Sequence, residues 1–158
     1  MTKNNEYKHD VTLAKPCIDQ PGEEWKTIPS FPSYQVSNQG RVRSQLLQFS
    51  GRKSPDWRVL SPGDNNGYPY VNLRKNGTSN VVTVHTLVLE AWVGPRPTID
   101  GERACTRHLN GIKTDNRVEN LAWGTMKENM ADKKIHGTDY HPRGEDHAKA
   151  IFTEAEVV

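Results

Sequence analysis

The sequence lacks the features that mark zinc sites, disulfide frameworks and membrane spans. It has two cysteines in 158 residues, Cys17 and Cys105, and neither belongs to a C-x-x-C pair. A structural zinc site takes four ligands, and Cys105 with the nearby His108 supplies only two, which argues against a zinc-stabilised interaction module. No apolar run approaches the roughly eighteen residues needed to cross a bilayer, and the amino end is polar. We therefore expect a cytoplasmic monomer with reduced thiols and no membrane partner.

An excess of charge of one sign is also missing. The chain has 21 Lys and Arg against 19 Asp and Glu, a formal net charge of +2, which does not by itself indicate a polyanionic partner. The distribution is uneven, because residues 39–75 contain seven basic side chains and two acidic ones. This middle third is a candidate phosphate-facing surface.

Large apolar side chains are scarce as well. Only 34% of the residues are hydrophobic while 25% are charged, so the core is modest. Twelve glycines and ten prolines favour many turns and short elements over long helices. The length suits one domain, or two small modules that share a thin core.

Two β-hairpins are predicted in the first half of the chain. Tyr34, Val36 and Val42 alternate around a turn at 37–40 that contains Asn and Gly. A second hairpin is predicted around a Lys-Asn-Gly turn at 75–77. Residues 46–64, rich in Gly, Pro and Ser, are expected to form a loop or a short additional hairpin.

A short helix should follow the second hairpin. Apolar residues recur at helical spacing over 84–92, and Pro95 and Pro97 end the pattern. His85 lies where the strand meets this helix, and we interpret it as a cap or a partly buried packing residue.

The stretch from 103 to 129 combines one histidine with a series of asparagines. We expect a strand over 105–109, a turn at 110–113, a return limb over 117–123 and a helix over 126–135. Thr125 and Glu128 have the spacing of a capping box at the start of that helix.

Two motifs resemble known modules. The pattern W-K-x-I-P followed by Y-x-V-S-N-x-G-R-V-R-S is similar to the NUMOD4 module found at the front of phage and bacterial HNH homing endonucleases. The pattern R-H-L-N-G-x-K-T-x-N-R-V-E-N-L-x-W-G-T, with its strand, loop, strand and helix, resembles the ββα-metal motif of HNH nucleases. The resemblance implies an α+β fold with a β-hairpin module in front of a ββα-metal core.

The resemblance also implies a division of the chain. We expect an arm over 1–22, a NUMOD4-like DNA-binding module over 23–83 and an HNH nuclease domain over 84–137. Residues 138–158 are similar to a linker followed by the start of a truncated carboxy-terminal helix.

Carried onto this sequence, the HNH motif implies roles for three residues. His108 falls on the general base, Asn120 on the residue that orients its ring, and Asn129 on a metal ligand. These residue types suit phosphodiester hydrolysis, because an imidazole with a near-neutral pKa deprotonates water well. Oxygen ligands suit Mg²⁺ or Mn²⁺, which stabilises charge on the leaving oxygen.

The metal site departs from the family pattern at two positions. Arg107 and Asn110 stand where relatives often carry metal-binding or acidic side chains, and an arginine does not ligate Mg²⁺. Asp132 and His136, on the same helix face as Asn129, are the additional candidate ligands.

We therefore predict a metal-dependent HNH endonuclease that nicks or cuts double-stranded DNA in a bacterial or phage-infected cell. The alternative is a catalytically degenerate HNH-derived module that binds DNA without turnover. The side chains expected to contact DNA are basic: Arg41, Arg43, Arg74, Lys75, Arg107, Lys113 and Arg117.

Overall fold

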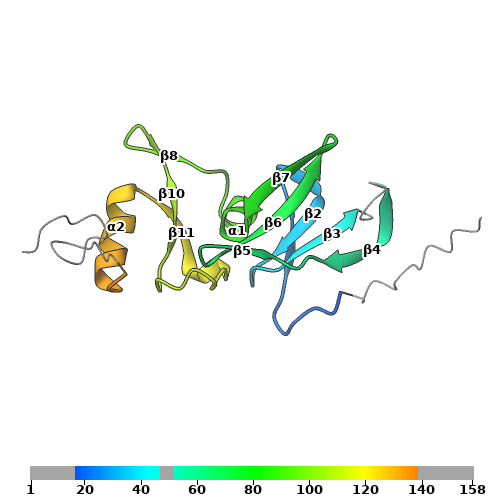
Figure 1. The fold of residues 1–158 in the computed structure, drawn as a ribbon, viewed down its shortest axis with the longest axis horizontal. Helices are drawn as coiled ribbons and strands as arrows, with labels where there is room; N and C mark the ends of the chain where they lie inside the picture. Colours follow the sequence, from blue (N-terminus) through cyan, green and yellow to red (C-terminus); the bar gives the residue numbers. More distant parts are fainter. Residues whose placement is uncertain (1–16, 47–51, 139–158) are drawn as a thin grey trace, which may run out of the picture.

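The computed structural model describes residues 17–46 and 52–138, and its elements run in a row from α2 at one end to β4 at the other (Figure 1). Most of the predicted arm (residues 1–16), residues 47–51 and the predicted linker and helix start (residues 139–158) lie outside the described residues.

The first sheet has four antiparallel strands in the order β1-β2-β3-β4. They span β1 Trp25–Ile28, β2 Phe31–Ser37, β3 Val42–Leu46 and β4 Lys53–Val59. The predicted hairpin is confirmed as β2–β3. Its turn includes Gly40, whose φ of 82° lies in the left-handed region that glycine adopts without strain.

The second sheet contains β5 Gly63–Asn65, β6 Tyr68–Lys75 and β7 Thr78–Thr83. The predicted hairpin is β6–β7, and its turn has positive φ at both central residues, Asn76 (52°) and Gly77 (79°). Such a turn matches the right-handed twist of the strands. The 46–64 segment supplies β4 and β5, one to each sheet, instead of an independent hairpin.

Helix α1 occupies Val84–Trp92, as predicted, and ends just before Pro95. It packs against strands of both sheets and against β11 (Figure 1). A small hairpin, β8 Thr98–Ile99 and β9 Glu102–Arg103, follows it.

One hydrophobic cluster joins these elements. β1 contributes Ile28, β2 contributes Val36, β6 contributes Leu73, α1 contributes Leu87 and β11 contributes Leu121, all buried. The cluster therefore crosses the boundary predicted between residues 83 and 84, and the two modules share a core.

The last part of the described chain has the predicted strand, loop, strand and helix. It comprises β10 Cys105–His108, a 3₁₀ turn η1 Val118–Asn120, β11 Leu121–Gly124 and α2 Met126–Ile135. The capping box is present, with the side chain of Thr125 accepting from the amide of Glu128 and the carboxylate of Glu128 accepting from the amide of Thr125. The α+β class is confirmed.

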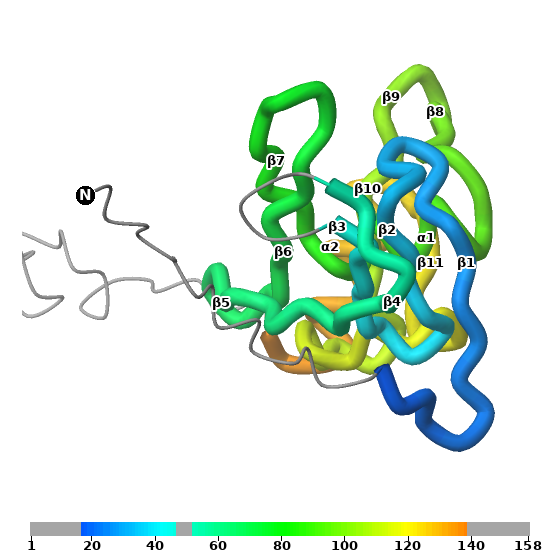
Figure 2. Tube along the Cα trace, turned by 90° about the vertical axis from the view of Figure 1, so that its right-hand side faces the viewer, coloured from blue at the N-terminus to red at the C-terminus, as the bar shows by residue number. Residues whose placement is uncertain are grey.

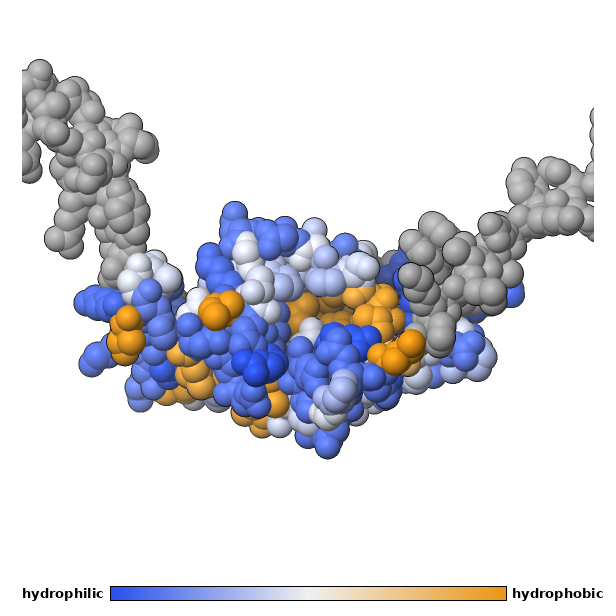
Figure 3. Space-filling view, turned by 90° about the horizontal axis from the view of Figure 1, so that it is seen from below, coloured by the Kyte–Doolittle hydropathy of each residue, from blue (hydrophilic) through white to orange (hydrophobic). Residues whose placement is uncertain are grey.

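Seen from below, the surface is largely hydrophilic, with several small apolar patches and one broader apolar area in a hollow right of the centre (Figure 3). Within the described part, no helix combines the length and apolar character that crossing a membrane requires. In the view turned by 90°, the end of the first sheet where β2 passes into β3 lies beside the loop that leads into β11 (Figure 2).

Candidate active site

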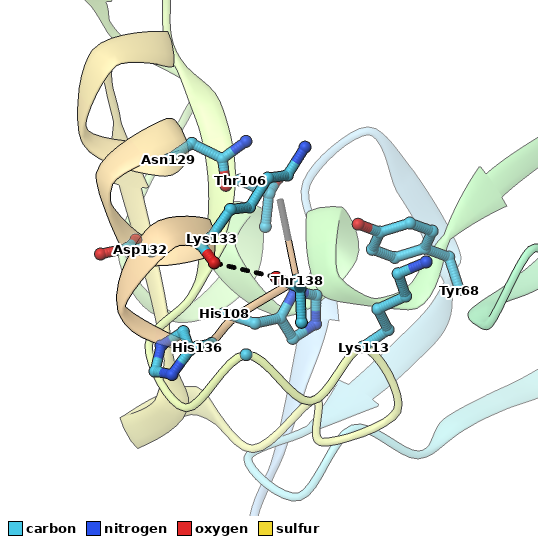
Figure 4. A pocket seen from close by; sticks show the side chains of 10 residues that line it. Tyr68, Thr106, His108, Lys113, Asn129, Asp132, Lys133, His136 and Thr138 are labelled. Atoms are coloured by element: carbon cyan, nitrogen blue, oxygen red, sulfur yellow. Dashed lines mark hydrogen bonds between the residues drawn. The ribbon is translucent and has the colours of Figure 1, made fainter. Parts of the chain in front are cut away.

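His108 lies at the end of β10, in a cleft of about 420 Å³ between β6, the loop after β10 and α2 (Figure 4). Tyr68 and Lys113 stand on the side opposite α2, and His108 lies between them and the helix. The register opposes His108 to Leu121 of β11, whose buried side chain fixes the strand to the core.

The ring of His108 is held by a buried amide. Its Nε2 lies 3.2 Å from Oδ1 of Asn116, which is 5% exposed. Because an amide oxygen only accepts, Nε2 must carry the proton, and Nδ1 keeps the lone pair. The Nδ2 group of Asn116 donates to the carbonyl of Thr114 (3.4 Å), which supports this orientation of the amide.

The pKa of His108 lies below its ordinary value. Burial is the main cause, and the hydrogen bond to Asn116 and the charge of Asp115 act in the opposite direction. A lowered pKa keeps the imidazole neutral at neutral pH, as a general base requires.

His85, which the sequence suggested to be a cap or a partly buried packing residue, is a neighbour of His108. The two rings meet edge to face with centroids 5.2 Å apart, and Tyr68 contacts both. Burial lowers the pKa of His85 to about 4, with His108 and Arg96 adding repulsion. Its Nε2 forms a hydrogen bond with the hydroxyl of Thr83 (2.9 Å). His85 is therefore a neutral aromatic ring that packs against the ring of His108.

Asn120, which the resemblance to the HNH motif implied would orient the ring of His108, has other partners. The ring of His108 is bonded by Asn116 instead. The carbonyl of Asn120 accepts from the amide of Leu109 at the base of the loop. Its side chain accepts from the amide of Asn110 (3.0 Å) and donates to the carbonyl of Asp115 (2.8 Å). Asn120 therefore closes the loop that carries Asn116.

Arg107 points to α2, not to solvent. It makes a two-pronged contact with Asp132 (2.7 and 2.9 Å) and an ion pair with Glu128 (3.1 Å). These contacts raise its pKa and lower that of Asp132. Gly124 leaves room for the arginine, because a Cβ there would meet its side chain. In the structure Arg107 links β10 to α2.

The candidate metal ligands are only partly available. Asn129 lines the cleft, whereas Asp132 is engaged by Arg107, and Nε2 of His136 donates to the carbonyl of Leu109 (2.9 Å). Among residues 17–46 and 52–138, no three His, Cys, Asp or Glu side chains come together as a metal cluster. The amide oxygen of Asn129 and the carboxylate of Asp132 fit a hard divalent cation in donor type.

Two of the predicted DNA-binding arginines have partners within the protein. Arg41 pairs with Glu23 (2.7 Å). Arg43 binds Gln35 (2.6 and 2.8 Å), and its guanidinium lies over the rings of Trp25 (4.2 Å) and Trp57 (4.8 Å). These contacts hold the first sheet together.

The remaining basic candidates differ in availability. Arg117 pairs with acidic neighbours on its own loop, and Lys113 donates to the carbonyl of Asn66 (3.0 Å) beside the cleft. Arg74 and Lys75 are exposed at the tip of β6. Lys133 of α2, which sequence reasoning did not select, also lines the cleft.

The hairpin-and-helix site belongs to a recognised class. Residues 82–131 match the HNH endonuclease family, and residues 23–74 match the NUMOD4 motif. The chain belongs to the HNH endonuclease family and carries a NUMOD4 module in front of the nuclease motif. Members of this family use a divalent metal ion.

Individual relatives include DNA endonuclease I-HmuI of Bacillus phage SP01, which is 31% identical over 116 residues, covering 73% of this chain and 60% of that protein. A solved structure described as DNA binding and cleavage by the HNH homing endonuclease I-HmuI matches with a TM-score of 0.58, covering 75% of this chain and 62% of that one. An uncharacterized HNH endonuclease of Acanthamoeba polyphaga mimivirus is 31% identical over 110 residues, 67% of this chain and 28% of the relative. The chain thus spans less than two thirds of each.

Proposed function

We propose that this protein hydrolyses phosphodiester bonds of double-stranded DNA, with His108 as the general base. The observation that carries the proposal is the 3.2 Å contact between Nε2 of His108 and Oδ1 of the buried Asn116, because the tautomer that donates in this contact keeps the lone pair of Nδ1 for a water proton. The similarity to I-HmuI, a DNA endonuclease by name, supports DNA as the substrate.

In the proposed reaction, Nδ1 of His108 takes a proton from water while the water oxygen forms a bond to phosphorus. The bond from phosphorus to the 3′ oxygen breaks, and the leaving oxygen takes a proton from solvent. Lys113 and Lys133, both at the cleft, are suited to hold phosphate oxygens on either side of the scissile bond.

Asn129 and Asp132 are the residues that would hold a Mg²⁺ or Mn²⁺ ion, Asp132 after release from Arg107. When bound, the ion supplies positive charge beside the leaving oxygen. With two protein donors, affinity in the absence of DNA should be weak. Tight Mg²⁺ binding to the free protein in calorimetry would contradict this ligand set.

The test is a plasmid-nicking assay with Mg²⁺, with Mn²⁺ and with EDTA. Wild type should nick with either metal, and His108→Ala should lose about 10²- to 10⁴-fold in rate while still shifting DNA in a gel.

A second candidate is a DNA-binding module without turnover. The ion pair of Arg107 with Asp132 favours it, since it occupies a candidate metal ligand. Binding without metal-dependent nicking by wild type, across several duplex substrates, would select this alternative. For either function we place the protein with DNA in the cytoplasm, which its two free cysteines support.

A further inference from the structure

The turn between β2 and β3, residues 37–40 (the front turn), lies against the loop that carries Asn116. The amide of Val118 donates to the carbonyl of Asn38 (2.8 Å). A Cβ placed on Gly40 would lie 2.7 Å from Cβ of Asn116 and 3.0 Å from its carbonyl oxygen. The missing side chain of Gly40 therefore permits the close approach of the backbone of Asn116.

The front turn is itself held in place. The hydroxyl of Ser37, which is fully buried, accepts from the amides of Gln39 (3.3 Å) and Arg41 (3.0 Å). The side chain of Asn38 accepts from the amide of Glu24 (3.0 Å) and donates to the carbonyl of Gly22 (3.0 Å). A turn with so many internal bonds is a firm support for whatever packs on it.

The contacts of Asn38 with Val118 and of Gly40 with Asn116 join the two segments that match different families. Asn38 and Gly40 lie within the NUMOD4 motif at 23–74, whereas Asn116 and Val118 lie within the HNH match at 82–131. Asn116 is the side chain that bonds the ring of His108. A path of direct contacts therefore leads from the front module to the candidate base.

We propose that the front turn is a positioning element for the active site, and that Gly40 and the carbonyl of Asn38 hold Asn116 where it fixes the ring of His108. The inference rests on the proposed role of His108 as general base. It gives the NUMOD4 module a part in catalysis besides any part in DNA binding.

The direct test is Gly40→Ala. Alanine at this position is strained by the positive φ and displaces Asn116, so the ring of His108 loses its fixed orientation. A displacement of about 1 Å at a catalytic group costs up to about 100-fold in rate. We expect the single-turnover cleavage rate to fall at least tenfold, while the Kd for DNA, measured with EDTA, stays within about twofold.

Gly101→Ala is the matched control. Gly101 has nearly the same φ (80° against 82°), but a Cβ there meets no described atom within 4 Å. This change carries the same backbone strain without touching Asn116, so the rate should be unchanged. Equal losses for the two glycines would overturn the proposal.

A second variant removes the hydrogen bond between the two segments. Val118→Pro deletes the amide that donates to Asn38 at the first residue of η1, a position where proline is tolerated, and Arg117 before it is already extended (φ −63°, ψ 140°). Its rate should fall in the same direction as that of Gly40→Ala. A wild-type rate would overturn the role of the Asn38 carbonyl.

A double-mutant cycle and a spectroscopic measurement complete the test. In the Asn116→Ala background, Gly40→Ala should have little further effect on rate, because both changes remove the same support. ¹⁵N NMR of the histidine rings should show protonated Nε2 in His108 of wild type and a mixture of tautomers in Gly40→Ala.

The NMR result does not depend on turnover, so it separates the two claims. A wild-type protein without cleavage activity would refute the proposed function. The effect of the front turn on the His108 ring could still be measured by NMR. An unchanged His108 tautomer in Gly40→Ala would refute the positioning even if wild type cleaves DNA.

Discussion

Replacing His85 by glutamine should remove a pH-dependent part of the stability of the fold. The pKa of His85 falls from 6.5 to about 4 in the folded protein because of burial and of the repulsion from His108 and Arg96, with Tyr68 completing its surroundings. As the pH falls below 6.5, the unfolded chain takes up a proton at this residue before the folded chain does. Stability from the neutral ring is therefore full above pH 6.5 and is lost as the pH falls to about 4.

The linkage relation gives the size of the effect. A histidine with these two pKa values loses about 1.4 kcal/mol of unfolding free energy between pH 7.5 and pH 5.5. Urea unfolding of wild type and His85→Gln at both pH values measures the contribution of this residue and of its repulsion with His108, because the carboxylates are present in both proteins. Wild type should lose about 1.4 kcal/mol more than the variant.

Equal losses in the two proteins would refute the reasoning, since they would show that His85 titrates alike in the folded and unfolded chains. An NMR titration of the His85 ring in the folded protein checks the same point directly. A midpoint near 6.5 would contradict the burial argument.

Three further changes test other contacts. Asn120→Ala should lower the free energy of unfolding by about 1–3 kcal/mol in urea denaturation, because it leaves buried partners in the loop unpaired; a loss of cleavage at wild-type stability would instead favour direct action on the base. Leu73→Ala, at a fully buried side chain, should cost about 2–5 kcal/mol by the same method, and a cost under 1 kcal/mol would argue against the shared core. Arg43→Gln removes both the charge and the planar contacts with Trp25 and Trp57, so the melting temperature should fall while the salt dependence of DNA binding stays unchanged; a flatter salt slope would assign Arg43 to DNA.

Local patterns in the sequence predicted local structure well. The helix at 126–135 was recognised from its capping box, and the helix at 84–92 from its apolar spacing and the prolines after it. The Asn-Gly pair at 76–77 specified a tight hairpin because both residues tolerate positive φ. In each case the determining residues lie within a few positions of one another.

The partners of the site side chains were harder to predict, because distant residues decide them. The resemblance to the HNH motif implied that Asn120 orients His108, but an irregular loop turns Asn116 toward the ring. Some basic residues that were predicted to contact DNA form ion pairs within the fold. Arg107, for example, pairs with Asp132, which lies 25 residues further along the chain. Neither the path of such a loop nor a long-range ion pair follows from periodicity.

Helix α2 has no buried residue, and Arg107 ties it to β10 through Asp132 and the half-exposed Glu128. The Arg107–Glu128 pair, with its half-exposed carboxylate, weakens as ionic strength rises, whereas the largely shielded Arg107–Asp132 pair is screened much less. Added salt therefore acts on the protein itself, by weakening one of the two ion pairs that hold the helix carrying Asn129, as well as on any attraction to DNA. Under the proposed function, a plot of cleavage rate against salt concentration combines both effects. The number of neutralised phosphates calculated from its slope would then be too high.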